Sequence, residues 1–317
     1  MSSQFVDMNS DGRHDILAGS FSGVPQWLEA QENGFAKPTN VVDQSGETVL
    51  IANFWNYETQ KWDTTERATS AGHCTSVSAV DWDADGDLDL ILGDYYGGRL
   101  FLRLNEGNAK EAKYATTNQP IMVGGKAAQI DKGLAAPRIA DWNGDGLFDI
   151  ICGGAKGGVF LLENAGTKTT PQFDAVQTLI APVDDSSNSY IKLVPTQDGE
   201  PTAPGSSFHV EPVDYDQDGD LDLLIGARSS WMAGPVKQLT DEEKARSQEV
   251  NQELNTLLAK LRKLTGTAKT TEERRQLATS KEYKTVLDQY RLLSVERQQY
   301  NTNPKKSGDF VWLYRRQ

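Results

Sequence analysis

Cysteine, histidine and long apolar runs are all scarce in this chain of 317 residues. Its two cysteines and three histidines are too few for a disulfide framework, and they show no zinc or Cys–His catalytic spacing. No apolar stretch is long enough to span a membrane, so we expect no membrane insertion. Cys74 and Cys152 lie just before or within apolar runs, and we expect both to be buried free thiols.

Positive charge is also in short supply, since 32 Lys and Arg stand against 45 Asp and Glu for a net charge of −13. The sequence shows no basic stripe, so we expect no nucleic-acid partner. The nucleophile elbow and the phosphate-binding loop are absent as well. These absences favour a binding or scaffold protein, although an enzyme with another kind of site stays open.

What the chain does have is a nine-residue acidic pattern, D-x-[DN]-x-D-G-x-x-D, in four copies. The copies begin at Asp7, Asp81, Asp141 and Asp214, and each is followed by three apolar residues and a glycine. Carboxylates at alternate positions direct their oxygens into one loop, which suits a hard cation such as Ca²⁺. Glycine at position 6 permits the turn that curls the loop around the ion. The pattern therefore predicts both a metal site and a repeat.

The surroundings of these loops argue against an EF-hand. That motif needs a glutamate at position 12 and flanking helices, whereas position 12 here is Ala18, Leu92, Cys152 or Ile225. The flanks are short runs rich in Val, Ile and Leu, which are typical of buried strands. The copies are 74, 60 and 73 residues apart, a period that suits one four-stranded β-propeller blade with its loops.

With these loops and strands, the chain resembles the FG-GAP (VCBS-type) repeat family, known from bacterial secreted proteins and the integrin α-subunit head. The resemblance implies a β-propeller with about four bound Ca²⁺ in the loops between first and second strands. It also implies side-chain ligands at loop positions 1, 3, 5 and 9 and a backbone carbonyl at position 7. The ligands so implied are Asp7, Asn9, Asp11, Arg13, Asp15, Asp81, Asp83, Asp85, Asp87, Asp89, Asp141, Asn143, Asp145, Leu147, Asp149, Asp214, Asp216, Asp218, Asp220 and Asp222.

The fold class expected is all-β, with about four four-stranded blades in residues 1–235, a helical insert at 236–304 and a returning strand at 305–317. We expect the last unit to be one strand short, because only one strand-like run follows the insert. A compact four-unit ring, an open half-ring completed by another copy, and a fragment of a longer protein all remain open. An open ring would leave a sheet edge that invites pairing, so self-association through that edge or through the insert is an expectation.

The insert shows a change of composition between about Thr240 and Tyr300, where glycine nearly vanishes. Val250, Leu254, Leu257, Leu261 and Leu264 recur at spacings of 4 and 3, a coiled-coil-like seam. The sequence predicts two helices of about 25 residues in an antiparallel hairpin, each begun by a capping box and separated at residues 265–267. Pro304 should end the second helix.

A ligand site is expected on the propeller face opposite the loops, where aromatic, basic and acidic side chains gather at the channel mouth. Its candidate residues are His73, Tyr95, Tyr96, Arg138, His209, Glu211 and Trp231. They would suit a glycan or a protein partner, because aromatic rings stack on sugars and Arg grips carboxylates. The alternative is that the rings fill loop cores, that Arg138 pairs with a nearby carboxylate, and that the histidines are ordinary.

Two functions from different classes follow. The first is an extracytoplasmic calcium-binding module for a glycan or protein partner, secreted, periplasmic or on the cell surface after loss of a leader, since such loops fill at millimolar calcium. The second is a carbohydrate-active enzyme, a polysaccharide lyase or sugar dehydratase, using a His–Glu pair as acid and base at the channel mouth.

Overall fold

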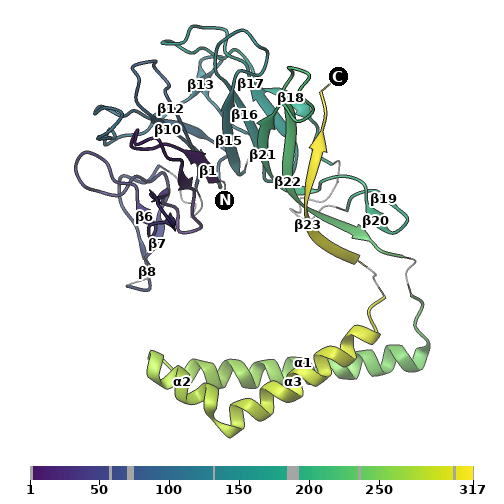
Figure 1. Ribbon diagram of the computed structural model, residues 1–317. Coiled ribbons are helices and arrows are strands. Elements are labelled where there is room, and N and C mark those ends of the chain that lie inside the picture. Colours follow the sequence, from purple (N-terminus) through teal and green to yellow (C-terminus); the bar gives the residue numbers. More distant parts are fainter. Residues whose placement is uncertain are drawn as a thin grey trace. The chain divides into compact units, whose positions relative to one another are not determined.

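The computed structural model describes residues 3–56, 59–69, 75–130, 133–183, 193–234, 237–302 and 305–316. The chain divides into two compact units (Figure 1). One is a β unit, Met1–Trp231 with Ser307–Gln317, and the other is a helical unit, Met232–Lys306. Among the described residues, no helix is both long and apolar enough to cross a membrane. The chain is mostly β, as expected, and its main sheets are small and antiparallel.

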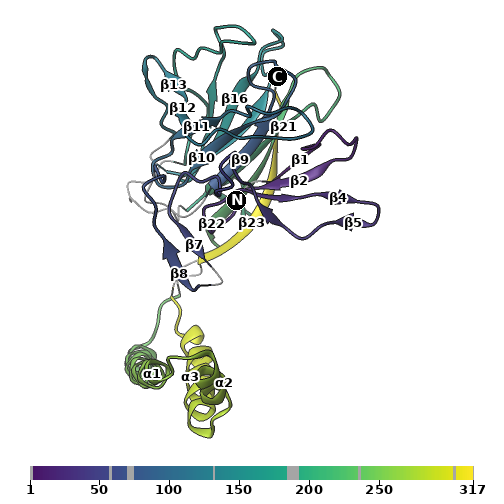
Figure 2. The same cartoon turned by 90° about the vertical axis from the view of Figure 1, so that its left-hand side faces the viewer.

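Four main antiparallel sheets form the β unit, and each contains one acidic loop between its first two strands (Figures 1 and 2). Sheet 1 consists of β1 (Ser3–Val6), β2 (Asp15–Ala18), β3 (Gln26–Leu28) and β6 (Thr39–Asn40). Sheet 2 consists of β9 (Thr75–Val80), β10 (Asp89–Asp94), β11 (Leu100–Arg103) and β12 (Gln119–Pro120). Sheet 3 consists of β15 (Ala135–Ala140), β16 (Asp149–Gly154), β17 (Val159–Leu162) and β18 (Gln177–Ile180). Sheet 4 consists of β21 (Ser206–Val213), β22 (Asp222–Met232) and β23 (Lys305–Tyr314).

Sheet 4 has three strands among the described residues, in agreement with the expectation that the last unit is one strand short. The helical unit lies in sequence between β22 and β23, so the chain leaves sheet 4 after its second strand and returns as the third. Short two-stranded ribbons lie in the connections between the main strands. They are β4 (Ala30–Gln31) with β5 (Gly34–Phe35), β7 (Phe54–Asn56) with β8 (Lys61–Asp63), β13 (Met122–Val123) with β14 (Lys126–Ala127), and β19 (Thr196–Gln197) with β20 (Glu200–Pro201).

The core consists of three apolar clusters, one between each pair of successive sheets. In the second strand of each sheet, alternate side chains point to opposite faces. Leu90 and Leu92 of β10 therefore join the cluster with sheet 1, whereas Ile91 joins the cluster with sheet 3. All three are fully buried. Each inner sheet is thus apolar on both faces, which explains its uninterrupted hydrophobic runs.

The helical unit contains α1 (Asp241–Thr267), α2 (Thr271–Thr279) and α3 (Lys281–Gln299). Both expected capping boxes are present, at Thr240 with Glu243 and at Thr270 with Glu273. Ion pairs join Arg246 to Glu296 and Lys260 to Glu282, so α1 and α3 run antiparallel. Within α1, Val250, Leu254 and Leu261 are the buried residues of the expected seam.

Two expectations about the helices are wrong. The predicted second helix is divided at Ser280, whose extended backbone (φ −64°, ψ 143°) ends α2 and whose hydroxyl accepts a hydrogen bond from the Tyr283 N–H to begin α3. A serine side chain that caps a helix competes with a continuous helix at that point. The predicted break at residues 265–267 also falls later, because α1 continues through Gly266 and is capped at Ala268. Pro304 lies outside the described residues.

Candidate metal centres

The aspartate at position 9 has the same two partners in all four loops. One carboxylate oxygen accepts a hydrogen bond from the backbone N–H of loop position 2, and the other accepts from an N–H just beyond the third strand of the same sheet. The four aspartates are buried. The pairs of donors are Met8 and Ala30 to Asp15, Trp82 and Asn105 to Asp89, Trp142 and Asn164 to Asp149, and Tyr215 and Arg316 to Asp222.

The carboxylates at positions 1 and 5 shape the turn of each loop. In the third loop, Asp141 accepts hydrogen bonds from the N–H groups of Asp145 and Gly146, and Asp145 accepts one from Leu147. In the other loops, too, the backbone N–H of position 7 donates a hydrogen bond to the position 5 carboxylate, at 2.9 to 3.1 Å. The glycine at position 6 has φ between 84° and 97° in every copy, which only glycine adopts without strain. The loop geometry is thus set by its own sequence.

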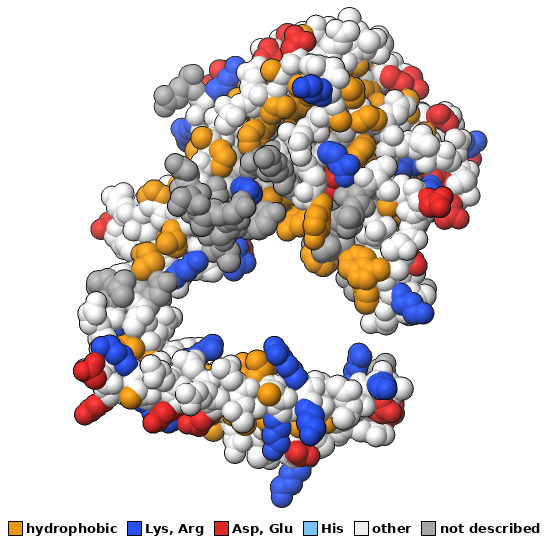
Figure 3. Space-filling view, turned by 180° about the vertical axis from the view of Figure 1, so that it is seen from behind, with side chains coloured by type: hydrophobic (Ala, Val, Ile, Leu, Met, Phe, Trp, Pro, Cys, Tyr) orange, Lys and Arg blue, Asp and Glu red, His pale blue; other side chains and the backbone are white. Residues whose placement is uncertain are grey.

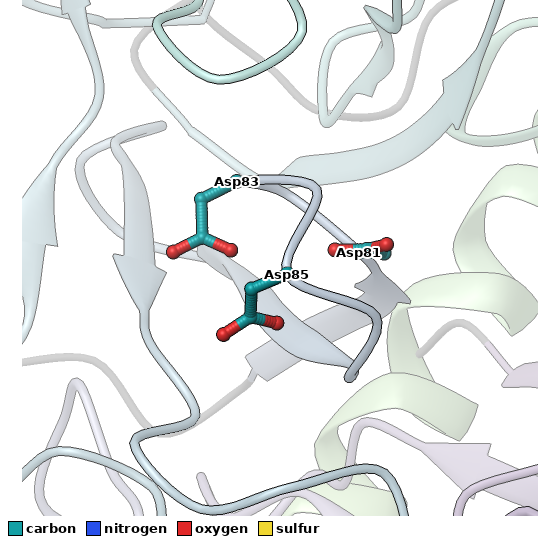
Figure 4. Close-up of side chains that lie close together, drawn as sticks. All are labelled: Asp81, Asp83 and Asp85. Carbon is teal, nitrogen blue, oxygen red and sulfur yellow. The ribbon is translucent and has the colours of Figure 1, made fainter.

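In loops two and four, three carboxylates converge. The side chains of Asp81, Asp83 and Asp85 surround one small space (Figure 4), and one oxygen of each lies within 4.8 Å of the others. Asp214, Asp216 and Asp218 are arranged in the same way. These are the side chains at positions 1, 3 and 5, which the resemblance implied as ligands. Each of the two groups could hold a metal ion.

The second loop has oxygens for which the described residues provide no hydrogen-bond donor. They are buried Oδ1 atoms of Asp81, Asp83 and Asp87. Burial, followed by the charges of the neighbouring aspartates, raises the pKa of Asp87 to about 6. Burial also raises the pKa of Asp89 to about 7, against the lowering effect of its two backbone hydrogen bonds. Carboxylates crowded in this way are stabilised by a bound cation, so the donor set fits a hard divalent ion.

Loops one and three have asparagine at position 3, and each asparagine faces a glutamate that sequence reasoning missed. Asn9 Nδ2 donates to Glu29 at 3.3 Å, and Asn143 Nδ2 donates to Glu163 at 3.1 Å. Both glutamates stand immediately before the N–H that binds the position 9 aspartate. In these two loops, a glutamate just after the third strand therefore supplies the negative charge that position 3 lacks. The equivalent residues beside the aspartate loops are Leu104 and Arg315, and neither is acidic.

The first loop carries a cation of its own. Arg13, at position 7, donates from Nη2 to Asp11 Oδ2 at 2.6 Å. Its neighbour Asp11 is a position 5 carboxylate, and hydrogen bonds from the Arg13 side chain and backbone lower its pKa. In the fourth loop, Arg315 lies 3.5 Å from Asp216. A metal ion in either of these loops would compete with a guanidinium for one ligand.

Of the expected ligand-face residues, the structure brings Arg138 and Glu211 together. Arg138 Nε donates to Glu211 Oε2 at 2.7 Å, so one expected alternative, pairing of the arginine with a carboxylate, is present. The buried guanidinium also donates to Ser78 Oγ at 3.3 Å and to the carbonyl oxygen of Ser3. These partners lie on β21, β9 and β1, and Arg138 lies on β15. One side chain therefore connects the first strands of all four sheets.

The remaining ligand-face residues are spread over the unit. Tyr95 and Tyr96 contact each other edge to face at 6.0 Å, and Tyr96 is 59% exposed. Trp231 is buried against Phe310, and its Nε1 donates to the Gly199 carbonyl at 2.8 Å. His209 lines a hollow of about 530 Å³ that also includes Gly226 and Val311. His73 lies outside the described residues, as does Cys74, while Cys152 is a buried free thiol.

The electrostatics of His209 differ from those of a general acid. Burial, together with the nearby Arg138 charge, lowers its pKa to about 3. Its imidazole is therefore neutral at physiological pH, with no proton to give as an imidazolium. The Glu211 carboxylate beside it on β21 is held by Arg138.

Comparisons with known proteins agree with the repeat structure. A family model described as FG-GAP-like repeat matches the chain twice, over residues 81–152 and 141–225. The search of curated proteins gave no match. Among solved structures, the chain is similar to an Agrocybe aegerita lectin with specific recognition of non-reducing terminal N-acetylglucosamine, at 18% identity and a TM-score of 0.31. The alignment covers 73% of this chain and 62% of the lectin, so the chain spans less than two thirds of that protein's length.

The two matched segments contain loops two, three and four, and the first loop repeats their pattern and their hydrogen bonds. The same buried aspartate, positive-φ glycine and strand order therefore recur in every sheet. On these grounds the chain contains FG-GAP-like repeats.

Proposed function

We propose that this protein is a calcium-binding FG-GAP module in which each of the four loops holds one Ca²⁺. The observation that carries the proposal is the set of buried, unpartnered Asp81, Asp83 and Asp87 oxygens in the second loop. Side chains at positions 1, 3 and 5 would hold the ion, with the position 7 carbonyl. The position 9 aspartate orients the loop through its two backbone hydrogen bonds. Calcium would supply charge neutralisation, and no chemical step is assigned to it.

The four sheets would then be the blades of a β-propeller. The apolar clusters between successive sheets and the hydrogen bonds of Arg138, on β15, with the other three first strands support this arrangement. Such loops are filled at the millimolar calcium concentrations found outside the cytosol. We therefore place the working protein in an extracytoplasmic compartment, where calcium would keep the loops rigid.

The module would act as a binding or scaffold protein for a glycan or another protein. The exposed ring of Tyr96 and the half-buried ring of Tyr95, at the turn after β10, offer a stacking surface for a sugar or an apolar side chain. Burial of Arg138 and Trp231 assigns those two residues to structure instead. The low pKa of His209 leaves its imidazole neutral at physiological pH, so it could not act there as a general acid.

Calorimetric titration of the chelated protein tests the calcium proposal. We expect about four sites for Ca²⁺, and loss of one site in Asp85→Ala and in Asp145→Ala. Asp309→Ala is the matched control, because its carboxylate is exposed on β23 and distant in sequence from any loop. Absence of binding at millimolar Ca²⁺, or an equal loss in the control, would show that the loops are ordinary acidic turns.

A glycan array and a binding screen against extracellular proteins, each with calcium and with EDTA, test the partner. Tyr96→Ala should weaken the binding found, and Tyr215→Ala should not, although both rings are more than half exposed. Equal effects of the two substitutions would remove the Tyr95–Tyr96 surface from the proposal while leaving the calcium result intact.

A further inference from the structure

The glycine that follows each loop, at position 13, is the place where one sheet meets the next. A Cβ added to Gly19 would collide with the carbonyl oxygen of Thr75, and one added to Gly93 would collide with that of Ala135. Gly153 is covered in the same way by Phe208. In three successive sheets, therefore, the first strand of the following sheet lies directly on this glycine. Only a residue without a side chain permits that approach.

Gly226 occupies the same position in sheet 4, but nothing among the described residues covers it. A Cβ there would come no closer than 3.8 Å to another atom, the carbonyl oxygen of His209. Its backbone φ is not positive, so a side chain would cause no strain. The glycine at position 13 is thus required by a neighbouring strand in sheets 1 to 3. In sheet 4 no described residue requires it.

The surroundings of Gly226 are mixed, because the hollow that contains it is lined by the polar His209, Arg228 and Asp309 as well as by Val311, and apolar side chains on the same strands are also exposed. Position 11 is fully buried in the first three sheets, as Leu17, Ile91 and Ile151, because it faces the following sheet. Its equivalent in sheet 4, Leu224, is only partly buried. On β23, Trp312 and Tyr314 pack against the sheet 3 side, whereas the alternate residues Val311 and Leu313 are 74% and 37% exposed.

In sheet 1 the opposite face is the one that no described residue covers. Positions 10 and 12 are buried in sheets 2 to 4, where they contact the preceding sheet. In sheet 1 these positions are Ile16 and Ala18, and both are partly exposed. Phe5 on β1 is 66% exposed on the same face, whereas its equivalent in sheet 2, Ala79, is buried. Apolar side chains accordingly reach the surface of the β unit in patches (Figure 3).

We propose that the outer face of sheet 4 is a docking site for sheet 1 of a second copy of this chain. The occupant follows from the repeat. At each of the three internal junctions, the face of one sheet that carries positions 11 and 13 packs against the face of the next sheet that carries positions 10 and 12. As far as the described residues show, one chain has one uncovered face of each kind. The contact is heterologous, so two copies can close into a ring and more copies can form a larger assembly.

The internal junctions also set the register of the contact. In all three junctions the carbonyl that meets the glycine belongs to the residue six positions before the next loop, and in one of them Gly93 also lies against Pro137, four positions before its loop. The residue of sheet 1 equivalent to Pro137 is Ser3, four residues before Asp7. Ser3 of one copy therefore rests near Gly226 of the other.

Light scattering over a wide range of protein concentrations, in saturating calcium, tests whether copies associate. We expect Gly226→Ala to weaken association roughly tenfold or more, since about 1.4 kcal/mol of lost contact is a factor of ten. Its melting temperature should match the wild type, because the added Cβ has room in the single chain. Gly93→Ala, by contrast, should unfold at lower temperature. A wild-type chain that stays monomeric overturns the proposal, as does unchanged association of Gly226→Ala.

A charged substitution provides an independent measurement. Val311→Asp should abolish association while leaving the fold intact, because this side chain is 74% exposed. Val295→Asp is the matched control on the helical unit, where the side chain is 61% exposed. Loss of association in the control alone would assign self-association to the helices and overturn the docking site.

Disulfide trapping identifies the two faces and separates a second copy from closure within one chain. Single variants Ser3→Cys and Gly226→Cys are mixed and oxidised, with wild type as the control for native thiols. A bond requires Cα atoms within about 7 Å. A mixed dimer supports the proposal. The double variant with both cysteines in one chain is oxidised in parallel. A bond that forms only within this variant as a monomer shows closure within one chain and overturns the proposal, and so does the absence of any bond.

Discussion

Asp222 accepts a hydrogen bond from the backbone N–H of Arg316 at 2.9 Å, although the two residues are 94 positions apart. In the other three sheets, the position 9 aspartate binds an equivalent N–H only 15 or 16 residues further on. The intervening helical unit therefore leaves the geometry of the repeat unchanged. β23 returns to the place that a third strand occupies in every sheet, and the aspartate connects it to the acidic loop.

Asp222→Asn should lower the free energy of unfolding by about 1–2 kcal/mol, because an amide leaves one of the two part-buried N–H groups without an acceptor. Urea unfolding in excess EDTA measures this effect apart from any metal. Asp309→Asn, on exposed β23, should change stability by less than about 0.5 kcal/mol. Equal stability of the two variants would mean that the hydrogen bond with Arg316 contributes nothing.

The calcium-free protein should lose stability as the pH rises from about 4 towards 6. The folded-state pKa of Asp87 is about 6, against an ordinary value of 3.8, so the folded state binds the proton more tightly than the unfolded state. That contribution is present at low pH and is lost as the pH rises through 6. Asp87→Asn should show a smaller slope in urea unfolding across this range.

Saturating calcium is the control for the same pH series, because a cation among the carboxylates removes the reason to bind a proton. In calcium, the free energy of unfolding should therefore change with pH by the same slope in the wild type and in Asp87→Asn. If the two slopes still differ by the same amount in calcium, the protonation of Asp87 is not linked to metal binding in this loop.

Arg138→Met should destabilise the β unit by about 3 kcal/mol, because charge-assisted hydrogen bonds contribute roughly 1.5–3 kcal/mol each. Glu211→Gln should cost less than about 1 kcal/mol, since the Glu211 side chain is 57% exposed and its ion pair is screened by water. Thermal and urea unfolding measure both. If Arg138→Met keeps full stability and instead loses a ligand found in the binding screen, the arginine is a binding residue.

Replacement of residues 237–302 by a short Gly/Ser linker should leave the β-sheet circular dichroism and the calcium titration unchanged. The helices form their own compact unit and bury Val250, Leu254 and Val286 among themselves. In the full chain, Val250→Asp should reduce the helical signal without lowering the melting temperature of the β unit. An unfolded β unit in the linker variant would show that the helices belong to its core.

The local features of this protein could be predicted from the sequence because their partners lie close along the chain. The loop turns are made by groups within nine residues, and each capping box by groups within three, so pattern and spacing determine them. The strands beside the loops followed from their apolar runs. The division of the second helix at Ser280 was missed, since a serine within a helical pattern can either cap or continue it.

Only the tertiary structure decided which distant groups meet. The sequence contains Arg138, Glu29 and Gly226, but it does not show what lies next to each of them. The structure places the other three first strands beside the arginine and Asn9 beside the glutamate, and it leaves the glycine uncovered by any described residue. Each of these depends on how successive sheets pack, and the same local pattern is compatible with several arrangements. The repeat specified what every loop and strand would be. The packing determined that one of its four identical glycines lies open.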